Sequence, residues 1–166
     1  WESDGDGTII NWSVPNPSFT VNLNRNYIWA KEWTPGNPVT VTVDGSTIPA
    51  TDVQPDGVFS FETPDIQPGQ VVIASDGVST KTLLVTSISV TSVNTDLDTI
   101  TGTAVPGSEI YVDGINDPIL VNGAGVWTGY FAWDLEPGSG GLARQIDEDD
   151  DWTEYGWYAP NPMIDV

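Results

Sequence analysis

An acidic run near the end of the chain has the residue types and spacing to bind a cation. Asp147, Asp149 and Asp151 alternate within residues 147–151 (DEDDD), here called the acidic loop. Carboxylates so placed in a tight loop converge on one ion, and Ca²⁺ takes about six to eight oxygen ligands. Without a cation, carboxylates held this close repel one another. We therefore predict that the acidic loop binds Ca²⁺; the alternative left open is a solvated, acidic hairpin tip.

The start of the chain repeats this spacing. Glu2, Asp4 and Asp6 also alternate, and we predict that they form an equivalent metal site at the other end. The twelve-residue EF-hand loop, with glycine at its sixth position and glutamate at its twelfth, is absent. Asp96 and Asp98 form a weaker second candidate, for which an ordinary Asx turn is the alternative.

Catalytic chemistry has little support in the composition. The chain has no histidine and no cysteine. This excludes Ser-His and Cys-His nucleophiles, imidazole or thiolate metal sites, and disulfides. Carboxylate pairs are frequent enough to imitate a glycosidase, but nothing in the sequence marks one of them for a raised pKa. We predict that the protein is not an enzyme and has no catalytic residues.

The eight tryptophans raise a second possible function, a carbohydrate-binding module that stacks sugar rings on exposed aromatic faces. Trp12 and Trp157 occupy matching positions of a repeated segment, and Trp127 matches Phe59 in another, so we expect these three tryptophans in the core. The tryptophans left to stack on a glycan are Trp1, Trp133 and Trp152. Trp33, which lies close to Pro35-Gly36, is a candidate for capping a domain junction.

The charge balance restricts the partners. There are 24 acidic residues and only four basic ones, which gives a formal net charge of −20. Nucleic acid needs a basic footprint and is excluded, and anionic membrane surfaces are disfavoured. No apolar run is long enough to cross a bilayer, so this segment has no membrane insertion. Lys31 and Lys81 are candidates for an isopeptide bond to an asparagine, with a plain salt bridge as the alternative.

The pattern of the chain predicts an all-β protein. Val and Ile outnumber Leu, and Gly and Pro interrupt the sequence at short intervals. Strands flank Asp-Gly turns at 44–45 and 76–77, which is the signature of β-hairpins, and another strand is expected at 18–23. The residues expected in the cores are Trp29, Val41, Val43, Phe59, Phe61 and Val72 in the first, and Ile110, Val112, Trp127 and Phe131 in the second.

Four landmarks recur in the same order at an offset of 68 to 71 residues. The pairs are Pro35-Gly36 with Pro106-Gly107, Val43-Asp44-Gly45 with Val112-Asp113-Gly114, Gly57-Val58-Phe59 with Gly125-Val126-Trp127, and Ile66-Gln67-Pro68-Gly69 with Leu135-Glu136-Pro137-Gly138. This predicts two tandem β-sandwich domains, at 22–87 and 88–157. Residues 86–94 are expected to pass directly from one domain to the other without a flexible linker.

The two ends of the chain resemble each other. Residues 1–21 repeat residues 146–166 at an offset of 145. We predict an N-terminal junction segment at 1–21 and a junction to the next unit at 158–166. If strand 155–159 completes the second domain, strand 9–14 belongs to the preceding unit, in one long chain or by strand exchange. The expected partners are copies of the chain, head to tail, through Ile9, Ile10, Trp12, Val14, Trp157, Pro160 and Pro162.

One stretch resembles a known family. Residues 100–114 (ITGTAVPGSEIYVDG), followed by Gly125-Val126-Trp127 and Leu135-Glu136-Pro137-Gly138, look like the bacterial Ig-like repeats found in tandem in large surface proteins and adhesins. The resemblance covers the second predicted domain throughout and the first more loosely. It implies two Ig-like antiparallel β-sandwiches in an extracellular, cell-surface stalk, adhesin or filament, often stiffened by calcium. The Trp-rich segment and the acidic loop are departures from those repeats.

Overall fold

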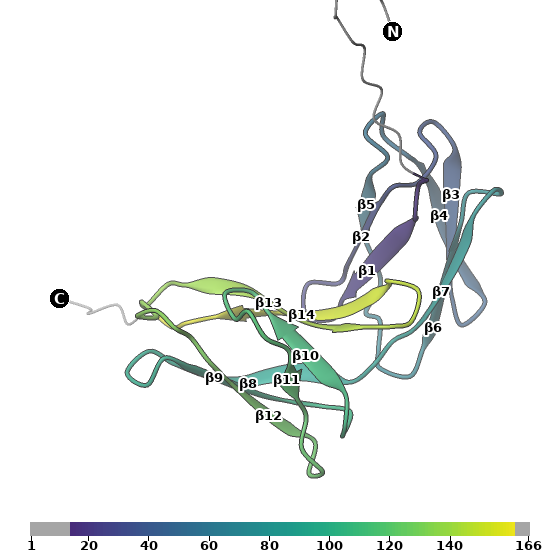
Figure 1. Ribbon diagram of the computed structural model, residues 1–166. Coiled ribbons are helices and arrows are strands. Elements are labelled where there is room, and N and C mark those ends of the chain that lie inside the picture. The colour runs from purple at the N-terminus through teal and green to yellow at the C-terminus, as the bar shows by residue number, and fades with distance from the viewer. Residues whose placement is uncertain (1–13, 162–166) are drawn as a thin grey trace, which may run out of the picture.

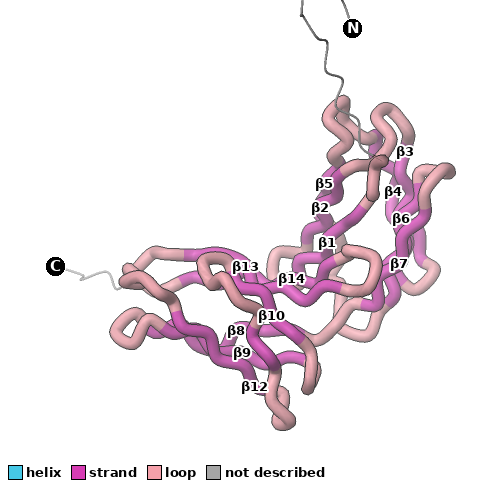
Figure 2. Tube along the Cα trace, viewed as in Figure 1, coloured by secondary structure: helices cyan, strands magenta, loops and turns pink. Residues whose placement is uncertain are grey.

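A computed structural model describes residues 14–161, without the side chains of residues 49 and 50. The prediction of an all-β fold is confirmed: this part of the chain holds fourteen strands and no helix, so it has no helix that could span a membrane (Figure 2). The strands are β1 (Ser18–Asn22), β2 (Tyr27–Lys31), β3 (Pro38–Val43), β4 (Ser46–Asp52), β5 (Phe59–Glu62), β6 (Val71–Ser75), β7 (Thr80–Leu84), β8 (Ile88–Asn94), β9 (Thr99–Ala104), β10 (Glu109–Val112), β11 (Ile119–Leu120), β12 (Val126–Tyr130), β13 (Gly140–Ile146) and β14 (Trp152–Tyr158).

The strands form three sheets. A seven-stranded sheet has the order β11-β10-β13-β14-β1-β2-β5, a four-stranded sheet the order β4-β3-β6-β7, and a three-stranded sheet the order β12-β9-β8. All pairings of the described strands are antiparallel except that of β1 with β14, which is parallel. The sequence did not predict this parallel pair, which joins the first described strand to the last.

The hydrophobic core lies in two clusters. One is built from residues between Phe19 and Val85, the other from residues between Ile88 and Trp157. Figure 1 shows two lobes set at an angle, which we call the first lobe (β1–β7) and the second lobe (β8–β14). The seven-stranded sheet passes from one lobe to the other where β1 pairs with β14. The domain limits 22–87 and 88–157 stay a prediction, with one correction at the first boundary.

That correction concerns residues 18–21, which were assigned to a separate junction segment. Phe19 and Val21 instead lie buried in the first cluster, and every residue of β1 is buried. The strand is covered on both sides because β2 and β14 flank it. The other boundary is tight: β7 ends at Leu84 and β8 begins at Ile88, and Val85 and Ile88 already belong to different clusters.

Most of the predicted core residues are buried or partly buried, but two tryptophans of the first lobe exchange their expected places. Trp29 was assigned to the core and is 39% exposed. Trp33 was assigned to a junction and is buried against Phe59, while its Nε1 donates a hydrogen bond to the Ser18 carbonyl oxygen at 3.0 Å. β2 alternates inward at Ile28 and Ala30, which turns Trp29 outward.

Candidate functional site

The acidic loop is the tip of the hairpin formed by β13 and β14. Ile146 pairs with Trp152 at its base. Within the loop, the backbone N–H of Asp147 donates to the Asp151 carbonyl oxygen at 3.0 Å. The Asp147 carboxylate accepts the backbone N–H groups of Asp149 at 3.1 Å and Asp151 at 2.9 Å. These bonds fold the loop so that one carboxylate oxygen from each of the three aspartates lies within 4.8 Å of the others.

Asp151 is the most buried carboxylate of the described residues, at 0% exposure. Its Oδ1 accepts the backbone N–H of Phe19 at 2.8 Å. Its Oδ2 is buried and has no hydrogen-bond partner within residues 14–161. Such an unpaired buried oxygen costs about 1–3 kcal/mol, and more when it is charged. A cation bound to the Asp151 carboxylate through Oδ2 would satisfy this oxygen.

The electrostatics of the loop also favour a cation. Burial raises the pKa of Asp151 to about 7, and the charges of Asp149 and Asp147 add to this, while the Phe19 hydrogen bond and Lys81 oppose it. Burial also raises the pKa of Asp147, helped by Asp149. Three hard carboxylate oxygens are ligands suited to a hard divalent cation. The residues present therefore fit a metal ion.

Side chains from two segments of the first lobe contact the acidic loop. Lys81 on β7 places its Nζ 3.3 Å from the Asp149 carboxylate and donates to the Asp149 carbonyl oxygen. Asn16, just before β1, donates from Nδ2 to the Asp150 carboxylate at 3.0 Å. The loop thus lies at the contact between the lobes. Lys81 thus forms a salt bridge, which was the alternative to an isopeptide bond.

The contact continues along β1 and β14 as a ladder of side-chain hydrogen bonds. Asn22 donates to the Glu154 carboxylate at 2.9 Å, and Asn24 exchanges two hydrogen bonds of 2.8 Å with the backbone of Gly156. Each pair is 132 residues apart, as is the pair formed by Phe19 and Asp151. Sequence reasoning missed these contacts, because residues so far apart leave no local pattern.

The structure thus brings together Asp147, Asp149 and Asp151, as the sequence predicted. Glu2, Asp4 and Asp6 lie outside the described residues. The Asp96 and Asp98 segment forms the Asx turn of the alternative: Asn94 Oδ1 accepts the Asp96 N–H at 2.9 Å. Asp98 Oδ1 accepts the backbone N–H of Leu135 at 2.8 Å.

The predicted interface residues differ in their exposure to solvent. Val14 and Pro160 are exposed, whereas Trp157 is buried in the second core at 5% exposure, next to the ring of Phe131. Trp157 is therefore a core residue, which its match to Trp12 had also suggested, and its place among the interface residues was wrong. The remaining interface candidates, Ile9, Ile10, Trp12 and Pro162, lie outside the described residues.

Comparison with known proteins gives structural neighbours only. No family model matches the chain, and no curated protein matches it. The BSP domain of a biofilm associated protein matches with a TM-score of 0.38 and 13% identity over 90% of this chain and 30% of its own. A structure of a 1.5-MDa bacterial ice-binding adhesin, studied for host cell surface retention, matches with a TM-score of 0.32 and 13% identity. The match covers 90% of this chain and 65% of the adhesin chain.

A third neighbour is the central fibronectin-III array of RIM-binding protein, with a TM-score of 0.33 and 10% identity over 92% of this chain and 71% of its own. The chain spans less than two thirds of the two bacterial neighbours. The neighbours are thus adhesin domains and tandem arrays. TM-scores of this size do not establish a common fold.

Proposed function

We propose that the chain is a structural repeat of an extracellular, cell-surface stalk or filament, in which Ca²⁺ in the acidic loop holds the two lobes together. The observation that supports this is the position of the site. Three carboxylates, one with an unpaired buried oxygen, converge where the second lobe bonds to β1 and β7 of the first. The proposed role is mechanical and needs no catalytic residue.

Calcium suits this loop better than magnesium. Ca²⁺ accepts six to eight oxygens in a flexible arrangement, whereas Mg²⁺ demands octahedral geometry and keeps several waters. The loop offers three carboxylates at a hairpin tip, which leaves the remaining ligand positions to water. A cation there removes the repulsion among the carboxylates and so stabilises the loop shape that holds Asp151 against Phe19.

The same units would join head to tail within one polypeptide. Ala159-Pro160-Asn161 after β14 matches Val14-Pro15-Asn16 before β1 at the offset of 145 residues. β14 pairs with β1 of its own chain, and this supports joining within one polypeptide, because this pairing uses no strand from a neighbour. Proline fixes φ and limits bending in the connection. Figure 1 shows the described chain leaving from different lobes at its two ends, as a linear array requires.

Calcium binding can be tested by isothermal titration of the metal-free protein. We expect saturable Ca²⁺ binding that Asp151→Asn weakens at least tenfold. The matched control is Asp117→Asn, which removes the same charge from an exposed position in the second lobe and should leave the affinity nearly unchanged. Absence of Ca²⁺ binding by the unmodified chain, or equal binding by Asp151→Asn, would contradict the proposal.

Head-to-tail joining can be tested on a protein with two successive copies of residues 18–162. Small-angle X-ray scattering in Ca²⁺ should give a single extended shape with close to twice the length of one unit. Replacing Pro160 and Pro162 at the connection by glycine should broaden the distribution of distances. A two-copy protein that is as flexible as its glycine variant would argue against a stiff stalk.

A further inference from the structure

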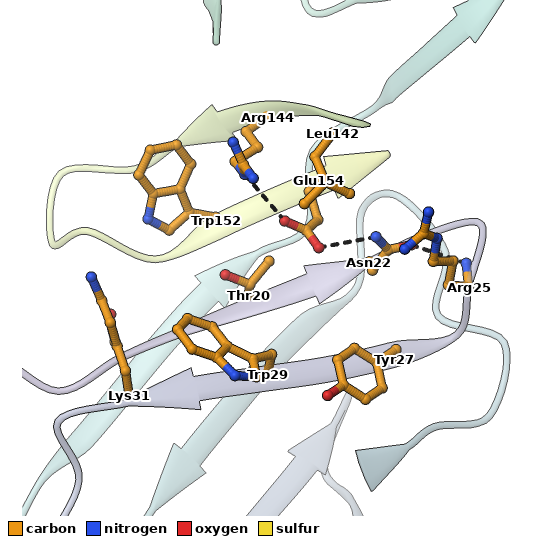
Figure 3. A pocket seen from close by; sticks show the side chains of 11 residues that line it. Thr20, Asn22, Arg25, Tyr27, Trp29, Lys31, Leu142, Arg144, Trp152 and Glu154 are labelled. Carbon is orange, nitrogen blue, oxygen red and sulfur yellow. Dashed lines mark hydrogen bonds and ion pairs between the residues drawn. The ribbon is translucent and has the colours of Figure 1, made fainter. Parts of the chain in front are cut away.

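A groove of about 460 Å³ lies on the face of the seven-stranded sheet where the lobes meet, and we call it the junction groove. Its walls come from β1 and β2 of the first lobe and β13 and β14 of the second (Figure 3). The volume is in the range of small-ligand sites, about 300–1,000 Å³. The acidic loop is not part of the groove lining, so the junction groove is a separate candidate site.

The groove gathers most of the positive charge of the protein. Three of the four basic residues of the chain, Arg25, Lys31 and Arg144, line it. Arg144 is neutralised by Asp113 and Glu154. Within residues 14–161, ion pairs engage Arg144 and Lys81 only, so Arg25 and Lys31 keep their charges available. In a chain with a net charge of −20, this concentration of cations favours an anionic ligand.

Two indole rings stand on either side of a small residue in the groove. Trp29 and Trp152 are both register partners of Thr20, on opposite sides of β1. Their strands are therefore two spacings apart, about 9–10 Å. Figure 3 shows Thr20 between the two tryptophans, with Lys31 beyond Trp29 on one side and Tyr27 on the other. Trp29 is 39% exposed, unlike the core tryptophans.

We propose that the junction groove binds an acidic oligosaccharide of the uronic-acid type. Sugar rings would stack on exposed Trp29 and on the part of Trp152 that its contacts with Tyr111 and Arg144 leave open. Thr20, which is 8% exposed, forms the floor between the two rings. Carboxylates would pair with Arg25, in the turn before β2, and with Lys31, at the end of β2. These two cations are at opposite ends of the row that Tyr27 and Trp29 occupy, which suits a ligand with several charges rather than a single acidic sugar.

An acidic peptide fits less well. Peptides that bind to sheets add a strand at an open edge, whereas the groove lies on the face of inner strands whose backbones are already paired. A saccharide ring offers an apolar face for the indoles together with hydroxyls and carboxylates at its rim. Trp133, another tryptophan considered for glycan stacking, is exposed elsewhere in the second lobe and does not line the groove.

The test measures binding of trigalacturonate, with neutral galactotriose for comparison, by isothermal titration in EDTA and in Ca²⁺. We expect binding of the acidic sugar only, in both conditions, and weakening as salt rises. Trp29→Ala and the double variant Arg25→Gln/Lys31→Gln should each weaken binding at least tenfold. Trp133→Ala, a matched loss of an exposed indole, and Lys31→Arg should bind within about twofold of the unmodified protein, with folding checked by circular dichroism.

Several results would overturn the inference. These are no binding of trigalacturonate, equal binding of the neutral sugar, or full binding by the groove variants. Binding that requires Ca²⁺ and is lost in Asp151→Asn would move the sugar to the acidic loop. Competition by a synthetic peptide with the sequence of residues 1–13 would make the groove a contact between copies of the chain. Ca²⁺ binding is measured without sugar, and sugar binding is measured in EDTA as well as in Ca²⁺, so this inference and the proposed function can fail separately.

Discussion

The β6–β7 and β13–β14 hairpins hold equivalent places in the two halves of the chain but end in different loops. Asp76, which begins the first turn, precedes Asp147 by 71 residues, within the range of 68 to 71 residues that separates the landmark pairs. The first hairpin closes in the tight Asp76-Gly77 turn, where Gly77 has φ of 81°. The second closes in the acidic loop, which contains five acidic residues in succession. Equivalent hairpins thus carry one carboxylate in one lobe and a cluster in the other.

The pKa values of the aspartates in the two turns are shifted in opposite directions. Burial would raise the pKa of Asp76, but hydrogen bonds from the backbone N–H groups of Ser79 at 2.7 Å and Val78 at 2.9 Å outweigh it, and the pKa is lowered. Burial raises the pKa of Asp151 to about 7, because one backbone hydrogen bond does not offset it and two carboxylates lie nearby. Asp76 Oδ2, like Asp151 Oδ2, is buried without a hydrogen-bond partner among the described residues. The difference is that Asp76 is the only carboxylate of its turn, whereas the acidic loop gathers three carboxylates, which favours a cation.

The largest predicted difference is in the pH dependence of stability. Between pH 4 and 7 the unfolded state releases the Asp151 proton while the folded state keeps it. The free energy of unfolding of the metal-free protein should therefore fall as pH rises through this window, by up to about 4 kcal/mol for a shift of about three units. Ca²⁺ should remove most of this loss. Asp76 acts with the opposite sign and only near or below pH 4, because its pKa is lowered.

Urea unfolding at pH 4.5, 6 and 8, in EDTA and in Ca²⁺, measures this effect. General repulsion in a chain with net charge −20 has the same sign. The informative comparison is thus between the two proteins: in EDTA, the free energy of unfolding should fall less steeply with pH in Asp151→Asn than in the unmodified protein. If the two slopes are the same, the raised pKa of Asp151 is wrong, and with it the contrast between the hairpins.

Lys81→Gln tests whether a side chain of the first lobe already serves the loop as a cation. Lys81 contacts the Asp149 carboxylate, which is itself half exposed, so we expect a loss of only about 1 kcal/mol in EDTA. Ca²⁺ affinity should rise about three- to tenfold, because a positive charge next to the site is removed. Titration calorimetry measures the affinity, and Lys31→Gln is the control with the same charge change. A weaker Ca²⁺ affinity in Lys81→Gln would contradict competition between the ammonium group and the ion.

The hairpins and the acidic loop could be predicted from the sequence. The Asp-Gly turns and the alternating strands predict hairpins, and alternating aspartates in one loop come together because the loop itself holds them. Which side chains of β2 face the core could not be predicted from the sequence. Tyr27, Ile28, Trp29 and Ala30 are all apolar or aromatic, so no alternation of polar and apolar residues shows which of them point inward. Burial of Trp33 and exposure of Trp29 follow from that orientation.

The contact between the lobes was also beyond the sequence. β1 and β14 pair in parallel across more than a hundred residues, and their ladder uses Asn22 and Asn24, which read locally as turn residues. The junction groove depends on the same pairing, because it places Trp152 of the last strand beside Thr20 of the first. Repeats predict units, but only the fold shows which strands meet between them.

Asp76→Asn should give the smallest effect and is the sharpest control on the comparison. An asparagine oxygen can still accept the hydrogen bonds of Val78 and Ser79, and the amide nitrogen replaces Oδ2, which has no hydrogen-bond partner among the described residues. We therefore expect a loss of about 0.5–1 kcal/mol. The difference in melting temperature between Ca²⁺ and EDTA should equal that of the unmodified protein, since Asp76 belongs to no cluster of carboxylates among the described residues. A reduced Ca²⁺ response in Asp76→Asn would mean that the two hairpins act as one unit, and the acidic loop would no longer account alone for the cation dependence.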